Sequence, residues 1–498
     1  MPALPHIVLV MADQLAARAL PAYGNPVVRA PNLARLGEES VVFERPLCAS
    51  PLCVPSRSSF VTGMLPSRTG VYDNASELPA SVPTFAHYLR LRGYRTVLVG
   101  KMHFIGPDQL HGFEERPMPD VYPAGLDWIP DWRLADDETL AWYHDLSSVQ
   151  RAGPVRETLQ VGYDTEVVGH ACRTILDSAR GDARPLLLVV SFTHPHDPYE
   201  VPASHWDRYD GVEIDAPAFP EPPETVDAPT RRLRAMVAAD RIPLEPEQVV
   251  AARRGYYGAV SLVDDHLGRI LTALREEGLA DETIVVVTSD HGDMLGERGL
   301  WYKMAPFEDS VRVPLLVHAP GRFEPRRVAE PVSLLDLAPT LVDLAGGFGE
   351  DGPAAEIDGR SLLPALHGEP APDRDVPLEY LAEGVRAPQV TLVRGSLKLV
   401  RELGEDDLVY DVAQDPGERT TLAATPDTDA LARTADSRWD LGRLDADVRA
   451  SQRARRLVAA ALATGELRPW DLPAAEPDGP YIRSGQDFWG RLERARRV

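Results

Sequence analysis

Polar clusters follow two apolar runs that have the composition of buried strands. Asp13 follows the run at residues 7–12, and Asp290, His291 and Asp293 follow Thr283–Ser289. Carboxylate oxygens are hard ligands, and the carboxyl ends of parallel strands meet at one edge of a sheet, so the two clusters could share a divalent cation. A lone aspartate at a strand end more often caps a helix or turn, and the pairing alone favours a metal only modestly.

Cys53 stands in the segment SPLCVPSR at residues 50–57, between two prolines that predict a turn, and Arg57 follows one helical turn later. The ordinary interpretation of such a residue is a buried structural cysteine. Against that interpretation, Cys-x-Pro-Ser-Arg is a specific string, and its context carries further reactive side chains.

The string resembles the signature of the sulfatase family, within the alkaline-phosphatase superfamily, in which the cysteine is oxidised to formylglycine. The resemblance extends to GKMHF at residues 100–104, SFTHPHDPY at 191–199 and TSDHGDMLGERGLWYKM at 288–304. With GPDQLHGFEER at residues 106–116 and SQRARRLVAAAL near the C-terminus, the chain most resembles the choline-sulfatase subfamily along essentially its full length.

The resemblance implies the chemistry of the converted cysteine. Hydration of the aldehyde gives a geminal diol, one hydroxyl of which attacks sulfur while the other later releases the sulfated intermediate. The metal lowers the pKa of the attacking hydroxyl and balances the charge of the sulfate. The implied metal-binding residues are Asp13, Cys53, Asp290 and His291.

The resemblance also implies roles for basic side chains. Arg57 holds the converted side chain and the residues around the metal, and Lys101 and Lys303 neutralise sulfate oxygens. His103 takes the proton of the second hydroxyl, and His196 protonates or stabilises the leaving oxygen, with His194 as the competing candidate.

Two departures from the family pattern concern the metal. Ala12 stands where many sulfatases have a first aspartate, and His291 stands where an asparagine is common. The resemblance favours Ca²⁺. Mn²⁺ and Mg²⁺ stay open as alternatives, because an imidazole ligand suits manganese better than calcium.

For the substrate, a quaternary ammonium has no hydrogen-bond donor and is recognised by aromatic faces and carboxylates. The candidate substrate-binding residues are Asn74 near the sulfate, with Trp128, His144 and Glu383 around the cation. Glu379 is the alternative to Glu383, whereas Trp132 and Trp142 are expected to belong to the core.

The elements that must position these residues follow from the apolar pattern. Unbroken apolar runs at residues 7–11, 96–99, 186–192, 283–289 and 315–317 predict strands buried on both faces. Helical patterns at residues 247–277 and 334–344 alternate with them. The expected fold is α/β, an alkaline-phosphatase-like sandwich with a mixed, mainly parallel central sheet, plus a smaller C-terminal α+β domain and a tail.

Composition shifts suggest three segments. A Pro-rich stretch at residues 366–376 separates a catalytic domain, 1–370, from a small sheet and helix domain, 371–450, which contains a predicted hairpin around Arg394-Gly395-Ser396. Residues 451–498 form a helix and tail that the resemblance links to a homo-oligomer, a dimer or tetramer.

Composition and charge exclude several classes of partner and location for this chain. The net charge of −24 over 498 residues disfavours nucleic-acid binding, and no apolar run is long enough for a transmembrane helix. Three cysteines and the absence of a signal-peptide pattern suit the cytoplasm. The expected partners are a small sulfate ester and a formylglycine-generating enzyme, without nucleic acid or membrane.

The expected function is hydrolysis of choline O-sulfate to choline and sulfate. The nearest alternative is an arylsulfatase or a phosphonate monoester hydrolase that uses the same converted cysteine. A non-catalytic binder of sulfated osmolytes fits less well, because a binder needs no proton-transfer residues.

Overall fold

The computed structural model describes residues 4–135, 138–220, 222, 226–371 and 374–466. Its centre is a seven-stranded sheet in the order β3-β5-β1-β7-β8-β2-β9. The strands are β1 (His6–Ala12), β2 (Val41–Leu47), β3 (Arg95–Gly100), β5 (Leu186–Phe192), β7 (Thr283–Ser289), β8 (Leu315–His318) and β9 (Arg326–Ser333). Only β8 runs against its neighbours among these seven, so the sheet is mixed and mainly parallel, as predicted.

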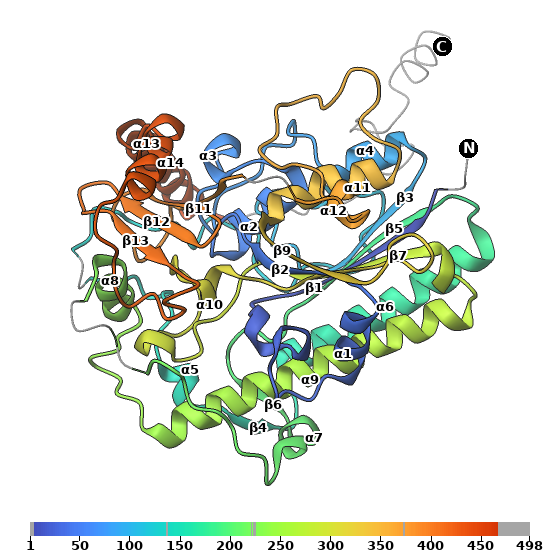
Figure 1. Ribbon diagram of the computed structural model, residues 1–498, viewed down its shortest axis with the longest axis horizontal. Helices are drawn as coiled ribbons and strands as arrows, with labels where there is room; N and C mark the ends of the chain where they lie inside the picture. The colour runs from blue at the N-terminus through green and yellow to red at the C-terminus, as the bar shows by residue number, and fades with distance from the viewer. Residues whose placement is uncertain (1–3, 136–137, 221, 223–225, 372–373, 467–498) are drawn as a thin grey trace.

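Helices cover both faces of this sheet (Figure 1). Along β1, Val8 and Val10 enter one hydrophobic core while Ile7 and Leu9 enter the other, which explains why the strand is apolar throughout. The helices of the first face are α1 (Pro31–Glu38), α6 (Leu159–Gly181) and α9 (Pro246–Glu276). Those of the second are α2 (Cys53–Thr62), α4 (Phe85–Leu91), α11 (Leu337–Leu344) and α12 (Leu363–Leu366).

A second, four-stranded antiparallel sheet lies beside the first (Figure 1). It contains β10 (Val376–Tyr380), β11 (Gln389–Arg394), β12 (Leu397–Glu402) and β13 (Leu408–Asp411), and α13 (Pro426–Arg438) and α14 (Leu441–Leu462) follow it. The predicted hairpin is the β11–β12 pair, whose turn places Gly395 at a φ of +56°, a value that favours glycine.

The predicted domain boundaries can be placed on this architecture. The second sheet begins at Val376, close to the predicted boundary at residue 371, but Val376 and Leu378 pack into a core of the central sheet. The predicted oligomerisation segment starts inside α14, and its part beyond Glu466 lies outside the described residues.

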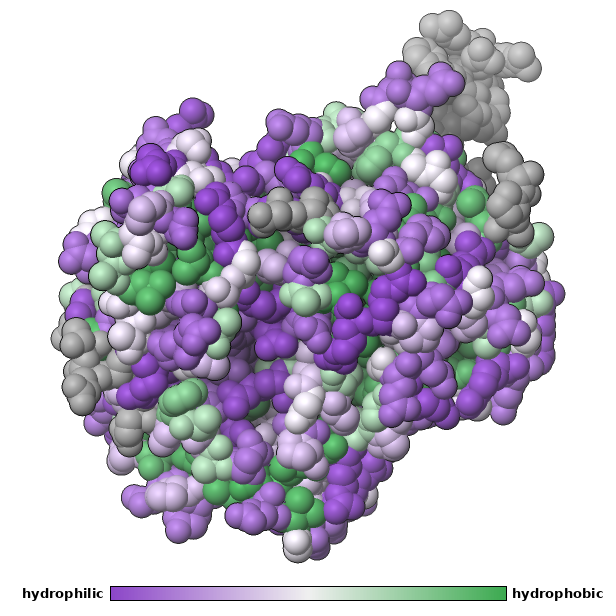
Figure 2. All heavy atoms as spheres, viewed as in Figure 1, coloured by the Kyte–Doolittle hydropathy of each residue, from purple (hydrophilic) through white to green (hydrophobic). Residues whose placement is uncertain are grey.

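The remaining α-helices and strands are short. They are α3 (Pro66–Thr69), α5 (Ser147–Gln150), α7 (Ala203–Trp206), α8 (Ala228–Met236), α10 (Glu308–Val311), β4 (Gly153–Val155) and β6 (Glu200–Pro202). The face in Figure 2 is mostly hydrophilic, with hydrophobic residues in separate groups. Within the described part of the chain, no helix combines the length and apolarity needed to cross a membrane.

Candidate active site

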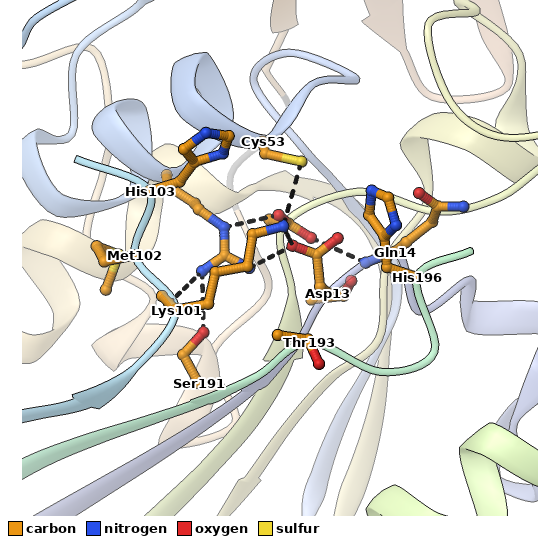
Figure 3. A network of polar contacts seen from close by, with 12 residues as sticks. Asp13, Gln14, Cys53, Lys101, Met102, His103, Ser191, Thr193 and His196 are labelled. Atoms are coloured by element: carbon orange, nitrogen blue, oxygen red, sulfur yellow. Dashed lines mark hydrogen bonds and ion pairs between the residues drawn. The ribbon is translucent and has the colours of Figure 1, made fainter. Parts of the chain in front are cut away.

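Four adjacent parallel strands bring reactive side chains to one edge of the central sheet. Lys101 follows β3, His196 lies just beyond β5, Asp13 follows β1 and Asp290 follows β7. The first turn of α2 places Cys53 above them, and Figure 3 shows Cys53, Lys101 and Asp13 converging between His103 and His196. The topology therefore assembles residues that are far apart in sequence, at the edge where ligands of open α/β sheets bind.

Arg57 connects the two acidic strand ends. Its Nε and Nη2 atoms lie 2.8 Å from carboxylate oxygens of Asp290 and Asp13, respectively. Its Nη1 donates to Ser191 Oγ at 2.9 Å and to the carbonyl of Lys101. All these side chains are buried, so Arg57 fixes the spacing of both carboxylates and offsets part of their charge.

The donor set at this edge fits a divalent cation. Ligand atoms of Asp13, Cys53, Asp290 and His291 all lie within 4.8 Å of one another. Asp13 Oδ1 is buried and has no hydrogen-bond partner among the described residues, which leaves it available to a cation. His291 Nδ1 lies 3.1 Å from the carbonyl of Gly292, an arrangement that directs Nε2 toward the cluster.

Cys53 is buried at the centre of this group. Its Sγ lies 3.2 Å from His291 Nε2 and 3.7 Å from Lys101 Nζ, and Lys101 also pairs with Asp13. Burial, together with the negative charge of Asp13, raises the pKa of the Cys53 thiol to about 11. The thiol is therefore protonated near neutral pH and is a weak nucleophile in this form.

Lys303 and His196 form a pair on the other side of the cluster. Lys303 Nζ lies 2.5 Å from His196 Nε2 and donates to Gln14 Oε1 at 2.7 Å, while His196 Nδ1 lies 2.7 Å from the carbonyl of Asp197. Burial and the charge of Lys303 hold the pKa of His196 well below its usual range. The imidazole is therefore neutral and accepts a hydrogen bond from the ammonium group.

His194, the competing candidate, lies elsewhere. Its Nδ1 is 2.6 Å from Asp164 Oδ2 of α6, and its backbone N donates to the same carboxylate. His196 lines the cavity above Cys53, whereas His194 does not. The geometry therefore supports His196 for a role near the reacting atoms.

His103 is buried and its φ is +58°, an uncommon value outside glycine. Its backbone N donates to Asp120 Oδ2 at 2.7 Å, and neither ring nitrogen has a hydrogen-bond partner among the described residues. Burial and the charge of Lys101 lower the pKa of His103 to about 3. A neutral imidazole at this position can accept a proton.

A cavity of about 560 Å³ opens above Cys53. All four predicted substrate-binding residues line it, together with two histidines and a lysine of the site: Asn74, Trp128, His144 and Glu383, and His103, His196 and Lys303. Trp128 and Trp142 stack in its wall, with ring centroids 6.5 Å apart and planes inclined by 29°. The prediction that Trp142 belongs to the core is wrong, because its ring is half-buried and faces this cavity.

The two candidate glutamates have different surroundings. Glu383 lines the cavity, its Oε2 has no hydrogen-bond partner among the described residues, and burial raises its pKa to about 7. Glu379 instead accepts hydrogen bonds from Ser67 and from Trp439 Nε1, each at 2.7 Å. Glu383 is therefore the carboxyl available to a ligand, whereas both oxygens of Glu379 accept hydrogen bonds from other parts of the protein.

Asn74 and Trp132 also connect to the site. Asn74 Oδ1 accepts from the backbone N of Val54 at 3.0 Å, next to Cys53. Trp132 is buried and donates from Nε1 to the carbonyl of Ala382 at 2.8 Å, which confirms that it belongs to the core.

Sequence reasoning missed three residues of the site. Gln14 bridges Lys303 and Asp293, Asp197 contacts His196, and the Tyr122 ring lies 3.8 Å from Lys101 Nζ. Gln14 and Asp197 directly follow residues that were identified, so adjacency was an available signal. Tyr122 belongs to a loop whose path no local pattern indicates.

Family models cover nearly the whole chain. The Sulfatase model matches residues 5–347, the model for the N-sulphoglucosamine sulphohydrolase C-terminal region matches 296–441, and the model for the choline sulfatase enzyme C terminal matches 446–498.

Individual relatives agree with these models. The chain is 41% identical to a choline-sulfatase of Rhizobium meliloti, over 99% of this chain and 98% of the relative. It is 26% identical to an arylsulfatase of Clostridium perfringens, over 84% and 90% of the two chains. The crystal structure of a phosphonate monoester hydrolase of Agrobacterium radiobacter matches with a TM-score of 0.68 at 27% identity, covering 89% of this chain and 96% of the other.

Proposed function

This chain belongs to the sulfatase family and is a sulfuric ester hydrolase, and from that premise we propose that its substrate is choline O-sulfate, cleaved to choline and sulfate. The observation that carries the choice of substrate is the cavity above Cys53. It combines the stacked rings of Trp128 and Trp142 with the buried Glu383 carboxyl, whose Oε2 has no hydrogen-bond partner among the described residues. A trimethylammonium group needs aromatic faces and a nearby negative charge, and this wall offers both.

Position 53 supplies the nucleophile in this proposal. Converted to formylglycine and hydrated, Cys53 provides one hydroxyl that attacks sulfur and a second that releases the product. Asp13, Asp290, His291 and the converted side chain would hold a divalent cation, which would make the nucleophile more acidic and offset the charge of the sulfate. Ca²⁺, Mn²⁺ and Mg²⁺ all accept this oxygen-rich set with one imidazole, and elemental analysis of the purified enzyme distinguishes them.

The chain's own cations bind the sulfate group. Lys101 and Lys303 are both buried in this cluster, and their pKa values are raised. Burial alone would lower both pKa values, but surrounding negative charges more than offset it. These are Asp13 for Lys101 and, for Lys303, position 53 when it is ionised, followed by Asp197 and Asp13. Both ammonium groups are therefore charged and can stabilise the oxygens of the transition state despite the net charge of the chain.

Two histidines are assigned the proton transfers of the reaction. The Lys303–His196 pair holds a proton at the cavity, where it can act on the leaving oxygen of choline. Neutral His103 lies on the other side of Cys53 and accepts the proton of the second hydroxyl. The opposed positions separate acid from base.

An aryl sulfate is the competing substrate, because Trp128, Trp142 and Tyr122 could also stack on an aromatic ring. Glu383 favours the cation, since a buried carboxyl gains nothing from an uncharged aryl group and repels an anionic one.

The test compares kcat/KM for choline O-sulfate with that for 3,3-dimethylbutyl sulfate, in which carbon replaces the ammonium nitrogen at the same shape. A 4-nitrophenyl sulfate and a phosphonate monoester complete the set. We expect choline O-sulfate to exceed its carbon isostere by about tenfold or more, the value of a desolvated cation–π contact. Equal values for the two isosteres would refute the choline assignment, and a phosphonate preference would support the alternative.

Three further points complete the proposal: a partner enzyme, an oligomeric state and a compartment. A formylglycine-generating enzyme converts Cys53, the chain forms a homo-oligomer, and the enzyme works in the cytoplasm. The three cysteines of the chain are unpaired, as suits a reducing compartment.

A further inference from the structure

Helix α14 contributes no residue to the described lining of the cavity, yet its side chains hold three segments that do. Arg449, Gln452 and Arg455 recur every three residues and, with the adjacent Arg456, face the body of the protein. Their contacts reach the loops that carry Asn74, Trp128 and Glu383.

The first contact leads toward the nucleophile. Arg455 forms a two-pronged pair with Asp73, Nη1 to Oδ1 and Nη2 to Oδ2, each at 2.7 Å. Asp73 is fully buried and also accepts from Ala75 N and Ser76 Oγ, each at 3.0 Å. The next residue, Asn74, accepts the backbone N–H of Val54 in the first turn of α2. Two residues thus separate the guanidinium group from the turn that holds Cys53.

The second set of contacts holds the aromatic wall. Gln452 Oε1 accepts from Trp132 N at 3.2 Å, Arg449 Nη1 donates to Trp132 O at 3.1 Å, and Arg456 Nη1 donates to Pro130 O at 3.0 Å. This fixes the backbone shortly after Trp128. Arg449 Nη2 also donates to the carbonyl of Arg386, and Trp132 Nε1 donates to Ala382 O, on either side of Glu383.

We propose that α14 is a positioning element of the active site, divided into two functions. Arg455, through Asp73 and Asn74, aligns the first turn of α2 and therefore the nucleophile. Gln452 holds the backbone of Trp132 and through it the spacing between Trp128 and Glu383. The assignment of the second function rests on the proposed choline substrate, whereas the first is independent of the leaving group.

The division predicts different kinetic signatures. Arg455→Ala leaves Asp73 buried without its charge partner and lets the turn shift, so kcat falls about tenfold or more for choline O-sulfate and for 3,3-dimethylbutyl sulfate alike. Arg455→Lys restores part of kcat, because it keeps the charge but loses the two-pronged geometry. Gln452→Ala instead reduces the preference for choline O-sulfate over its isostere by about threefold or more, mainly through KM.

The experiment measures kcat and KM of the full-length, metal-loaded enzyme for both esters, together with Tm. Arg453→Ala is the matched control, because Arg453 lies on the exposed side of the same helix, and it should match the wild type. Where Arg455→Ala fails to fold, Arg455→Lys and Asp73→Asn provide the measurement.

The outcomes are distinguishable. A folded Arg455→Ala variant with wild-type kcat, or a Gln452→Ala variant that changes both esters equally, would overturn the corresponding half of the inference. A wild-type enzyme without preference between the two esters would refute both the choline assignment and the role of Gln452. The role of Arg455 would still be tested, because Arg455→Ala should lower kcat for both esters.

Discussion

The chemistry depends on residues whose charge state is set by burial. Four of these residues are buried in or around one cavity: Cys53, His103, His196 and Glu383. Burial raises the pKa of Cys53 and Glu383 and lowers the pKa of the two histidines, which in each case favours the neutral form. The paired cations Lys101 and Lys303 keep their charge there because negative groups surround them. Two of these residues give predictions that can be tested separately.

His196 is predicted to act on the leaving oxygen. His196→Gln should lower kcat/KM for choline O-sulfate by about 10²–10³, because an alkoxide is a poor leaving group without a proton donor. The same variant should lose far less with 4-nitrophenyl sulfate, whose phenolate leaves without protonation. Equal losses on both substrates would remove His196 from that role and leave it as a binding residue.

Glu383 is predicted to give the enzyme a pH-dependent preference. Its pKa of about 7 means that the carboxyl is neutral below that pH and negatively charged above it. The ratio of kcat/KM for choline O-sulfate to that for its carbon isostere should therefore rise as the pH increases through about 7, and other titrating groups cancel in the ratio. Glu383→Gln should make the ratio independent of pH, and a wild-type ratio that is flat between pH 6 and 8 would contradict the assignment.

At the scale of elements, the strand ends supply the site and α2 closes it. The sequence predicted β1, β5 and β7 with bounds within one residue of those observed, because strands buried on both faces are apolar throughout. It did not predict β2 or β9, which contain charged residues and proline near an edge of the sheet. The metal-binding group was predictable from motifs, but the contacts of α14 with the cavity walls link segments more than 300 residues apart, and no local pattern encodes them.

Arg57 gives a stability prediction at this scale, since it joins α2 to the ends of β1, β5 and β7. Arg57→Ala in metal-depleted protein should lower the free energy of unfolding by about 3–5 kcal/mol, because it leaves the carboxylates of Asp13 and Asp290 buried without that partner. Urea unfolding measures the change. The control is Arg443→Ala, which breaks an exposed pair with Asp447 in α14 and should cost less than about 1 kcal/mol; similar losses in the two variants would contradict the role assigned to Arg57.

At the scale of the whole molecule, the C-terminal region connects the active site to the proposed oligomer. The end of α14 exposes Leu457, Val458 and Leu462, with 73%, 47% and 43% of their surfaces accessible. Neighbouring apolar side chains on one exposed helix end are typical of a surface that another segment or subunit covers. This observation supports the sequence-based proposal that residues 451–498 contribute to oligomerisation.

Truncation after Glu466 tests that proposal without cutting α14. We expect the shortened chain to form an assembly of fewer subunits by light scattering than the full-length protein, while still unfolding cooperatively. Leu457→Ser in the full-length chain should shift the assembly in the same direction, because it removes apolar area from the proposed contact. An unchanged number of subunits in both variants would exclude this region from the interface.

The proposed mechanism depends on the chemical identity of position 53 in active enzyme. The mass of the tryptic peptide that ends at Arg57 measures it directly, because conversion of the thiol to an aldehyde lowers the mass by about 18 Da. We predict that the converted fraction of this peptide equals the fraction of active sites found by burst titration, and that Cys53→Ala is folded and inactive. Full activity in material whose peptide retains an unmodified cysteine would contradict the mechanism.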